Sequence, residues 1–382
     1  MKRCGAEVRI GSAEILSRNA EGFQIRISSG SGNGAAGTAG KREAGLPEED
    51  AVVIGKHLLL ATGSVPVIPS IPGVAEGMEK GTVLTSREIL DLPVVPPSLV
   101  IVGGGIIGLE MASYFHSAGS EVTVVEMLDH IAGNTDREIA QILKKDYQKK
   151  GMTFYLNTRV TQVKEGTVVC ESHVHENSQG KTFSLTADRI LLSIGRRPWT
   201  QGLGLERIGV ELDHGRVRTD ERCCTNVPGV YAAGDINGIS MLAHTAYREA
   251  EVAVNNILGK EDRMQYYAVP SVIYTNPEVA GVGETEETAA AKGMDCKVAR
   301  LPMNYSGRYM AENERGDGIC KVLAEKEQQR IIGVHLIGNY SSEIIYGAAL
   351  MIEKGMRVQD IKKMIFPHPT VGEIIREAVF EL

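Results

Sequence analysis

The order of hydrophobic and polar positions predicts several kinds of element in the first part of this chain. Residues 6–10 and 23–27 alternate between the two classes, as the strands of an antiparallel ribbon do. Residues 28–40 are almost all Gly, Ser, Ala, Thr and Asn, which predicts a flexible loop because this composition buries little surface. A further strand is predicted at 57–61, followed by an extended linker through the prolines of residues 66–72.

Residues 99–126 have the pattern of a strand, a helix and a second strand. The apolar run 99–102 is followed by a glycine turn, a helical run that ends at Ala118, and a second apolar run at 121–126. Gly119 is a typical helix stop. This βαβ pattern predicts a parallel sheet covered by helices, the α/β class that includes Rossmann-like domains.

The last part of the chain has a different order of elements. A strand-like run at 331–336 is followed by helical runs at 342–354 and 369–380. Strands followed by helices, instead of alternating with them, indicate an α+β domain.

Composition and charge narrow the class of partner. Glycine occupies 43 of 382 positions, above the usual share of roughly 7%, which indicates many tight turns and close approaches to ligands. The formal net charge of −7 favours a small-molecule substrate and argues mildly against nucleic acid or a membrane surface. We expect a cytoplasmic protein, because residues 1–7 do not resemble a signal peptide and no run of about 18 apolar residues occurs. The six cysteines are too sparse for a disulfide framework or a zinc site, so no metal is expected.

The glycine turn carries the first candidate chemistry. Gly103, Gly105 and Gly108 form G-x-G-x-x-G between a strand and a helix, where backbone amides can bind a pyrophosphate. Glu126, eighteen residues after Gly108, ends the next strand and can accept hydrogen bonds from a ribose diol. A carboxylate there repels a 2′-phosphate, and no arginine follows in residues 127–129, so NAD is favoured over NADP. The alternative interpretation is a glycine turn with a surface glutamate.

A second match to the same motif lacks this context. Gly32, Gly34 and Gly37 also fit G-x-G-x-x-G after a strand-like run, but no apolar helix follows them. A glycine-rich linker produces such matches by composition alone, so we expect no nucleotide site there.

A histidine and a glutamate near the end of the chain form a second candidate site. Pro369 suits the first turn of a helix, which places His368 at the helix entrance and Glu373 about one turn inside. A histidine oriented by a carboxylate can act as a general acid or base. A surface histidine beside an ordinary helical glutamate explains the same residues.

Six motifs, taken in order, resemble the pyridine nucleotide-disulphide oxidoreductases over essentially the whole chain. They are Ala61-Thr62-Gly63, Gly103-Gly104-Gly105-Ile106-Ile107-Gly108-Leu109-Glu110, Ser193-Ile194-Gly195-Arg196-Arg197-Pro198, Tyr231-Ala232-Ala233-Gly234-Asp235, Met241-Leu242-Ala243-His244, and His368 to Glu373. Within that family, Met241 to His244 and the His-Pro-Thr ending look most like the dihydrolipoamide dehydrogenases. The set is highly specific, although no single motif is.

The resemblance implies two cofactors, FAD and NAD, and oxidation of protein-bound dihydrolipoamide to lipoamide with reduction of NAD⁺. It implies that FAD is contacted by Thr62, Gly63, Ser64, Gly234, Asp235, Met241, Leu242, Ala243 and His244. It implies that NAD is bound by Gly103, Gly104, Gly105, Ile106, Ile107, Gly108, Glu126, Val160 and Gly195. Taken singly, Gly234 and Asp235 also fit a strand-ending turn, and Val160 and Gly195 fit a core position and a turn.

The resemblance also implies partners. His368 would be the acid/base, oriented by Glu373, and in the family this pair works on the disulfide of the opposite subunit. A homodimer is therefore implied. Its protein partner would be the lipoyl domain or lipoyl carrier protein of a 2-oxoacid dehydrogenase or glycine cleavage complex.

One family feature has no counterpart in this sequence. Members open with a strand, a separate G-x-G-x-x-G turn for FAD and a helix bearing Cys-x-x-x-x-Cys, and no two cysteines here have that spacing. Cys223 and Cys224 are adjacent, and we expect them to be structural because an adjacent disulfide has strained geometry. We expect an N-terminally truncated chain, inactive alone, in which the FAD half is incomplete.

The expected organisation has four segments: a partial FAD-binding domain at 1–81, an NAD-binding Rossmann domain at 82–197, a second segment of the FAD and central domain at 198–266, and the α+β dimerisation domain at 267–382. Two alternatives for function stay open. The first is a non-catalytic fragment that binds NAD and dimerises. The second is a family member that acts on glutathione or mercuric ion or as a transhydrogenase.

Overall fold

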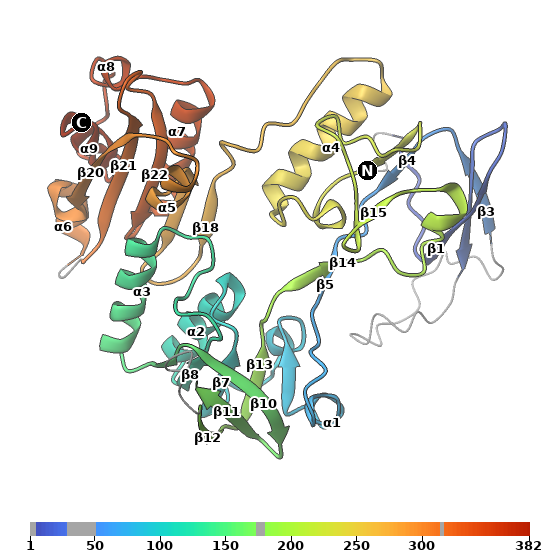
Figure 1. The fold of residues 1–382 in the computed structure, drawn as a ribbon, viewed down its shortest axis with the longest axis horizontal. Coiled ribbons are helices and arrows are strands. Elements are labelled where there is room, and N and C mark those ends of the chain that lie inside the picture. The colour runs from blue at the N-terminus through green and yellow to red at the C-terminus, as the bar shows by residue number, and fades with distance from the viewer. Residues whose placement is uncertain (1–4, 29–50, 173–179, 314–316) are drawn as a thin grey trace. The chain divides into compact units, whose positions relative to one another are not determined.

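The computed structural model of this chain describes residues 5–28, 51–172, 180–313 and 317–382 (Figure 1). Its internal contacts divide it into two compact units, each built from two separate segments. Unit 1 consists of Met1–Val65 and Arg196–Gln265, and unit 2 of Pro66–Gly195 and Tyr266–Leu382. None of the helices in the described ranges has the length and apolar composition that crossing a membrane requires.

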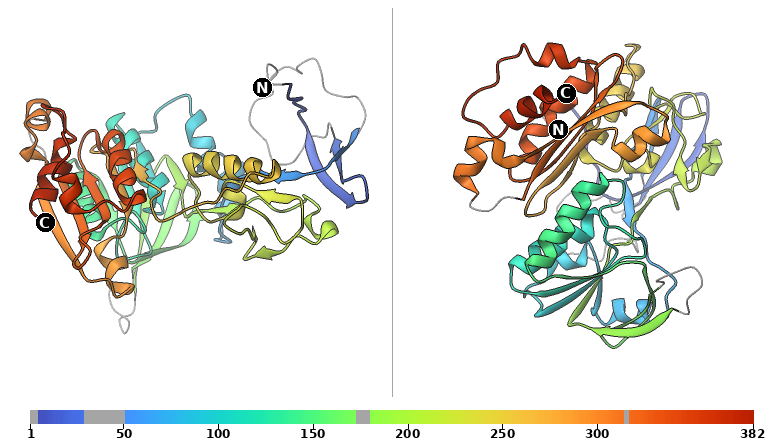
Figure 2. Two further views of the ribbon diagram at one scale, coloured as in Figure 1. Left: turned by 90° about the horizontal axis from the view of Figure 1, so that it is seen from above. Right: turned by 60° about the vertical axis from the view of Figure 1, so that its left-hand side comes forward.

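Unit 1 begins with a three-stranded antiparallel sheet, drawn in blue in Figures 1 and 2. Its strands β1 (Ser12–Arg18), β2 (Phe23–Ser28) and β3 (Ala51–Gly55) lie in that order. The ribbon predicted from the alternation is confirmed, but residues 6–10 form no strand. Val8 is 54% exposed, and no described strand pairs with this stretch, so its alternation has no sheet face to bury.

Most of the predicted glycine-rich loop lies outside the described residues. This holds for residues 29–40, with the second motif match at Gly32, Gly34 and Gly37.

The two segments of unit 1 are joined by a parallel pair of strands. β4 (Leu58–Leu60), which is the strand predicted at 57–61, pairs with β17 (Val230–Ala232). Both strands contribute to one buried cluster with the first sheet, through Leu60 and Phe23 among others. The other elements of unit 1 are β5 (Ser64–Pro66), β14 (Arg196–Pro198), η3 (Leu205–Ile208), β15 (Leu212–Asp213), β16 (Arg216–Val217), η4 (Asp235–Asn237) and α4 (Ala243–Ile257).

Unit 2 contains the βαβ segment that the sequence predicts. It consists of β7 (Ser98–Val102), α2 (Ile106–Ser117) and β8 (Glu121–Val125), in a parallel sheet with the strand order β6-β13-β7-β8-β9. The other elements here are α1 (Val74–Glu79), β6 (Val83–Thr85), η2 (Glu88–Asp91), α3 (Arg137–Lys149), β9 (Thr153–Tyr155), β10 (Thr158–Lys164), β11 (Thr167–Ser172), β12 (Lys181–Thr186) and β13 (Arg189–Leu192).

Strand β7 is apolar from Leu99 to Val102 because both of its faces are buried there. Leu99 and Ile101 belong to one hydrophobic cluster, whereas Val100 and Val102 belong to another. Successive side chains of a strand point to opposite faces, so the sheet is covered on both sides, as parallel sheets usually are.

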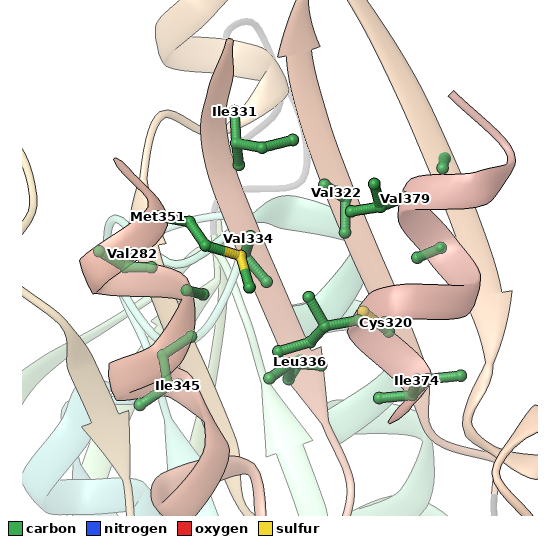
Figure 3. Packing of buried hydrophobic residues seen from close by; sticks show 14 of the residues in the cluster. Val282, Cys320, Val322, Ile331, Val334, Leu336, Ile345, Met351, Ile374 and Val379 are labelled. Atoms are coloured by element: carbon green, nitrogen blue, oxygen red, sulfur yellow. The ribbon is translucent and has the colours of Figure 1, made fainter. Parts of the chain in front are cut away.

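The C-terminal part of unit 2 is an antiparallel sheet with helices, the predicted α+β arrangement. Its strand order is β18-β19-β22-β21-β20. Buried side chains of the central strands pack against helices α7 and α9 (Figure 3). The elements are β18 (Ser271–Ile273), β19 (Val279–Gly283), α5 (Glu286–Ala291), β20 (Cys296–Pro302), η5 (Met303–Tyr305), α6 (Gly307–Glu312), β21 (Ile319–Glu325), β22 (Ile331–Ile337), α7 (Ser341–Glu353), α8 (Val358–Ile361) and α9 (Glu373–Phe380).

The last helix is shorter than predicted. The proline at position 369 predicts a helix over 369–380, whereas α9 spans Glu373–Phe380. Before it, the Thr370 N–H donates to Glu373 Oε2 at 2.8 Å, so the side chain of Glu373 closes a turn there. Glu373 is therefore the first residue of α9, and not one turn inside it.

Candidate functional site

The glycine turn after β7 is open at the start of α2. Gly105 is the N-cap of α2 and has no side chain that could accept a hydrogen bond from the helix. The first amides of a helix have no intrahelical acceptor either. No atom lies within 4 Å of the position that a Cβ would take on Gly105. An anion therefore has room to approach these amides and the positive end of the helix dipole.

Gly103 is required by close packing instead. Its φ is +107°, and a Cβ there would lie 2.5 Å from the backbone oxygen of Ser193. A glycine is therefore needed at 103 for the tight turn, and a glycine at 105 leaves room for a ligand to approach.

Glu126 lies beside the same turn. Its Oε2 accepts the Gly104 N–H at 2.6 Å, and its Oε1 accepts the Leu128 N–H at 2.8 Å. Each carboxylate oxygen retains acceptor capacity for a hydroxyl group. The predicted partners Gly103 to Gly108 and Glu126 are therefore brought together, and they fit the adenosine half of a dinucleotide.

Ser193, at the end of β13, holds the turn from the other side. Its Oγ donates to the backbone oxygen of Gly103 at 2.9 Å, and Gly195 follows two residues later with φ +122°. Sequence reasoning did not single out this contact of Ser193. Val160 is only 6% exposed and belongs to the buried cluster that includes Val102, so its contact with NAD stays a prediction.

In unit 1, three polar side chains meet at the beginning of β5 and η4. The Ser64 Oγ donates to the Asp235 carboxylate, and Arg196 Nε donates to Ser64 Oγ at 2.7 Å. Nearby, Thr62 Oγ1 donates to the backbone oxygen of Trp199 at 2.7 Å. The structure brings the predicted Thr62, Ser64 and Asp235 together, and it adds Arg196, which had only been part of a motif.

The turn after β17 leads into η4, whose last residue contains a buried donor without an acceptor among the described residues. Gly234 has φ +79°, and its N–H donates to the buried Glu249 carboxylate at 2.6 Å. Asn237 is 1% exposed, and its Nδ2 has no hydrogen-bond partner among the described residues. Gly63 has no atom within 4 Å of its Cβ position. An open glycine and an unsatisfied buried donor fit a surface that receives a polar cofactor.

The start of α4 is uncovered. Leu242 is its N-cap without a side-chain hydrogen bond, and Met241, Ala243 and His244 are exposed. These four predicted residues share one helix end in unit 1, to which an acceptor group of FAD could bind.

The predicted histidine–glutamate pair is formed in unit 2. His368 Nδ1 lies 2.8 Å from Glu373 Oε1. The His368 side chain is 78% exposed and that of Glu373 is 18% exposed. The pKa of the Glu373 carboxyl lies below its ordinary value, first because the Thr370 N–H donates to it and also because of His368. An ionised carboxylate accepts a hydrogen bond from Nδ1–H, which leaves Nε2 as the basic nitrogen.

The cysteines of the described residues form no disulfide with one another. All of these are free thiols, and burial raises the pKa of the Cys223 thiol to about 12. Thiolates, and not thiols, attack disulfides, so a buried thiol of this kind is unreactive. The free thiols are Cys170, Cys223 and Cys320, which are buried, and Cys224 and Cys296, which are partly exposed.

Comparison with known protein families gives two matches. The family model described as pyridine nucleotide-disulphide oxidoreductase matches residues 24–250, and the model of that family's dimerisation domain matches residues 269–379.

Several characterised proteins are similar in sequence. The chain is 40% identical to the mitochondrial dihydrolipoyl dehydrogenase of Pisum sativum over 331 residues, 86% of this chain and 65% of that protein. It is 39% identical to the leghemoglobin reductase of Glycine max over 331 residues, 86% of this chain and 62% of that protein. It is 38% identical to the mitochondrial dihydrolipoyl dehydrogenase of Bos taurus over 352 residues, 91% of this chain and 68% of that protein. The chain thus spans about two thirds of the length of these relatives.

Two solved structures have a similar fold. LpdA from Mycobacterium tuberculosis matches with a TM-score of 0.82 at 25% identity, over 97% of this chain and 76% of that one. The HOCl-induced flavoprotein disulfide reductase RclA from Escherichia coli matches with a TM-score of 0.80 at 26% identity, over 97% of this chain and 78% of that one.

Proposed function

Because this chain belongs to the pyridine nucleotide-disulphide oxidoreductase family, we propose that it takes part in the dihydrolipoyl dehydrogenase reaction. In this reaction, protein-bound dihydrolipoamide is oxidised to lipoamide. The dithiol loses two electrons and two protons, NAD⁺ takes up both electrons and one proton as a hydride, and the second proton is released. The contact of His368 with Glu373 carries the proposal, because thiol oxidation needs a positioned base.

His368 would move the proton. With Nδ1–H bound to the Glu373 carboxylate, Nε2 can take a proton from a thiol and return it in the reverse direction. Glu373 would stabilise the imidazolium that forms, since its own charge is maintained by the Thr370 amide. The exposed ring is accessible to a substrate that arrives on another polypeptide.

The family binds FAD and NAD(P), and we assign the two cofactors to different groups of residues. For NAD, the group is Gly103 to Gly108 with Glu126, Val160 and Gly195. For FAD, the group is Thr62 to Ser64, Gly234, Asp235 and Met241 to His244. When bound, FAD would carry electrons between the dithiol and the nicotinamide. We propose NAD and not NADP, because the Glu126 carboxylate beside Gly104 would repel a 2′-phosphate.

The chain carries the family's dimerisation domain, and we propose that it forms a homodimer in which His368 serves the partner's disulfide. The lipoyl domain or lipoyl carrier protein of a 2-oxoacid dehydrogenase or glycine cleavage complex would be its substrate protein.

We propose the four segments 1–81, 82–197, 198–266 and 267–382 as domains. The cytoplasmic location stays a prediction; the relatives from Pisum sativum and Bos taurus are mitochondrial.

The test is dihydrolipoamide-dependent NADH formation by the protein isolated from its own cells with its bound polypeptides. The His368→Gln variant, prepared in the same way, should lose roughly 10²- to 10⁴-fold in kcat, the usual contribution of a general acid/base. It should still bind NADH. Equal kcat values for the two proteins would exclude His368 as the acid/base.

A specific observation favours a second candidate, a non-catalytic NAD-binding and dimerising chain. No two of the six cysteines are separated by four residues, so these 382 residues do not contain the spacing of the family's redox pair. NADH binding and dimerisation without any dihydrolipoamide oxidation in the native isolate would establish this candidate. Oxidation of glutathione or another thiol in place of dihydrolipoamide would indicate a different disulfide reductase of the family.

A further inference from the structure

A lysine in unit 2 is buried among three carboxylates. The Lys321 side chain on β21 is 1% exposed, and its Nζ lies 2.7 Å from Asp136 Oδ2 and 3.2 Å from Glu138 Oε2. Nζ also contacts the Glu286 carboxylate on α5. A buried ammonium group is tolerated only when it is paired and hydrogen-bonded in this way.

Asp136 connects Lys321 to the beginning of α3. Its Oδ2 accepts from Lys321, while its Oδ1 accepts the N–H groups of Glu138 at 3.1 Å and of Ile139 at 3.2 Å. Asp136 is the N-cap of α3 and is fully buried. One carboxylate therefore fixes the first turn of α3 and also ties that turn to β21.

The short segment before Asp136 reaches the glycine turn. The Ala132 N–H donates to the backbone oxygen of Gly104 at 2.8 Å, and the Thr135 N–H donates to the backbone oxygen of Ala132 at 3.1 Å. Ala132 has φ +64°, a conformation that a residue with a side chain keeps only where its surroundings hold it. A displacement of Asp136 would therefore be passed to the contact between Ala132 and Gly104.

This segment is held by packing at one end and borders a cavity at the other. The cavity has a volume of about 190 Å³, and its lining includes Thr135, Asp136, Gly283 and His335. Ala132 is buried in a hydrophobic cluster that includes Ile273 and Val279 of the antiparallel sheet. The ion pair of Asp136 with Lys321 adds a polar connection from the same segment to β21.

We propose that Lys321 is a positioning residue for the dinucleotide site. Through Asp136 it holds residues 132–136 against Gly104, and so it keeps the glycine turn in the shape that binds NAD. The inference rests on the proposed NAD site, but it assigns a role to a residue of the α+β region whose ammonium group is ion-paired with three carboxylates.

The test measures the Kd for NADH by fluorescence titration of the whole folded chain. Lys321→Met should raise Kd at least about tenfold, the equivalent of one well-made hydrogen bond. Asp136→Asn keeps an oxygen for the amides of α3 and removes the charge pair, so it should weaken NADH binding similarly. If Lys321→Met does not fold, the Kd of Asp136→Asn for NADH tests the inference in its place. The double variant should bind NADH no more weakly than either single variant, because both changes break the same connection.

Arg300→Met is the matched control. Arg300 donates to Glu138 at 2.9 Å and contacts Glu286, so its loss removes a positive charge from the same cluster but leaves the pair of Lys321 and Asp136 intact. Its Kd for NADH should equal that of the wild type. A folded Lys321→Met variant with wild-type Kd, or an equal loss in Arg300→Met, would overturn the inference alone. Absence of NADH binding by the wild type would overturn the proposed NAD site, and the inference with it.

Discussion

The two oxygens of Glu373 have different partners: Oε1 lies 2.8 Å from His368 Nδ1, and Oε2 accepts the Thr370 N–H at 2.8 Å. The backbone amide fixes the carboxylate, and the carboxylate in turn fixes the ring. An imidazole held in this way has one tautomer, with the proton on Nδ1 and the basic lone pair on Nε2. The position of Glu373 as the first residue of α9 also places its charge at the positive end of the helix.

Glu373→Gln should destabilise the chain in a pH-dependent way. The pKa of this carboxyl is depressed in the folded state, first by the Thr370 amide and then by His368, so its contribution to stability is present above the ordinary value of 4.5 and is lost as pH falls through the folded value. At pH 7, the variant should lose about 1 kcal/mol of unfolding free energy, the worth of one hydrogen bond. Urea denaturation at pH 7 and below pH 4.5 measures the difference. An equal loss at both pH values would contradict this origin.

Gly103→Ala and Gly105→Ala should have opposite phenotypes. At Gly103, the φ of +107° and the Ser193 oxygen 2.5 Å from the new Cβ should cost about 2 kcal/mol or more of stability. At Gly105, φ is −76° and the space is open, so the fold should keep its stability. The new methyl group would, however, occupy the side from which a pyrophosphate approaches. Thermal denaturation and NADH titration of both variants separate the two effects; tight NADH binding by Gly105→Ala would remove this turn from the cofactor site.

Glu126→Ala should weaken NADH binding and reduce the preference of the chain for NADH over NADPH. The loss of a carboxylate that binds a ribose diol should raise the Kd for NADH about tenfold, as expected for a hydrogen bond to a charged group. NADPH should gain relative to NADH, because the repulsion of its 2′-phosphate is removed. Glu121→Ala, an exposed position at the start of β8, is the control with unchanged Kd. An unchanged ratio of the two Kd values in Glu126→Ala would show that Glu126 does not select the cofactor.

Native-state alkylation should divide the described cysteines into two classes. Burial raises the pKa of the Cys170 thiol to about 11 and that of Cys223 to about 12, so neither forms much thiolate at pH 8. Cys224 and Cys296 are partly exposed and should react with iodoacetamide first. Peptide mass spectrometry before and after denaturation measures this order. If Cys223 is labelled as fast as Cys224, Cys223 is not protected by burial, and the adjacent pair would again be a candidate redox centre.

The sequence predicts contacts between residues that are close along the chain, and it misses contacts between residues that are far apart along it. Gly103 to Gly108 and Glu126 lie within one βαβ segment, and His368 and Glu373 are five residues apart, so local patterns were enough to predict that these residues lie together. By contrast, Ser64 and Asp235 are 171 positions apart, and Asp136 and Lys321 are 185 apart. No periodicity along the chain reports such contacts, because they depend on how strands from distant segments pair.

Two errors in the predicted elements have simple physical origins. Residues 6–10 alternate like a strand but have no pairing partner in the described parts of the chain, and alternation alone forms no sheet. Pro369 suits a helix start, but it equally suits the turn that the Glu373 side chain closes before α9. The first error comes from a missing partner strand, and the second from a side-chain contact that the pattern does not contain.

The central proposal is that these 382 residues carry the NAD site and the acid/base pair of a dithiol oxidoreductase, but not the spacing of the family's redox-active cysteine pair. It is tested most directly by the rate of dihydrolipoamide-dependent NADH formation at 340 nm, measured on the purified chain supplied with FAD and NAD⁺. The account predicts no rate above that of free FAD, from a chain that binds NADH. Sustained turnover by the chain alone would contradict it, because the redox centre would then lie among its own residues.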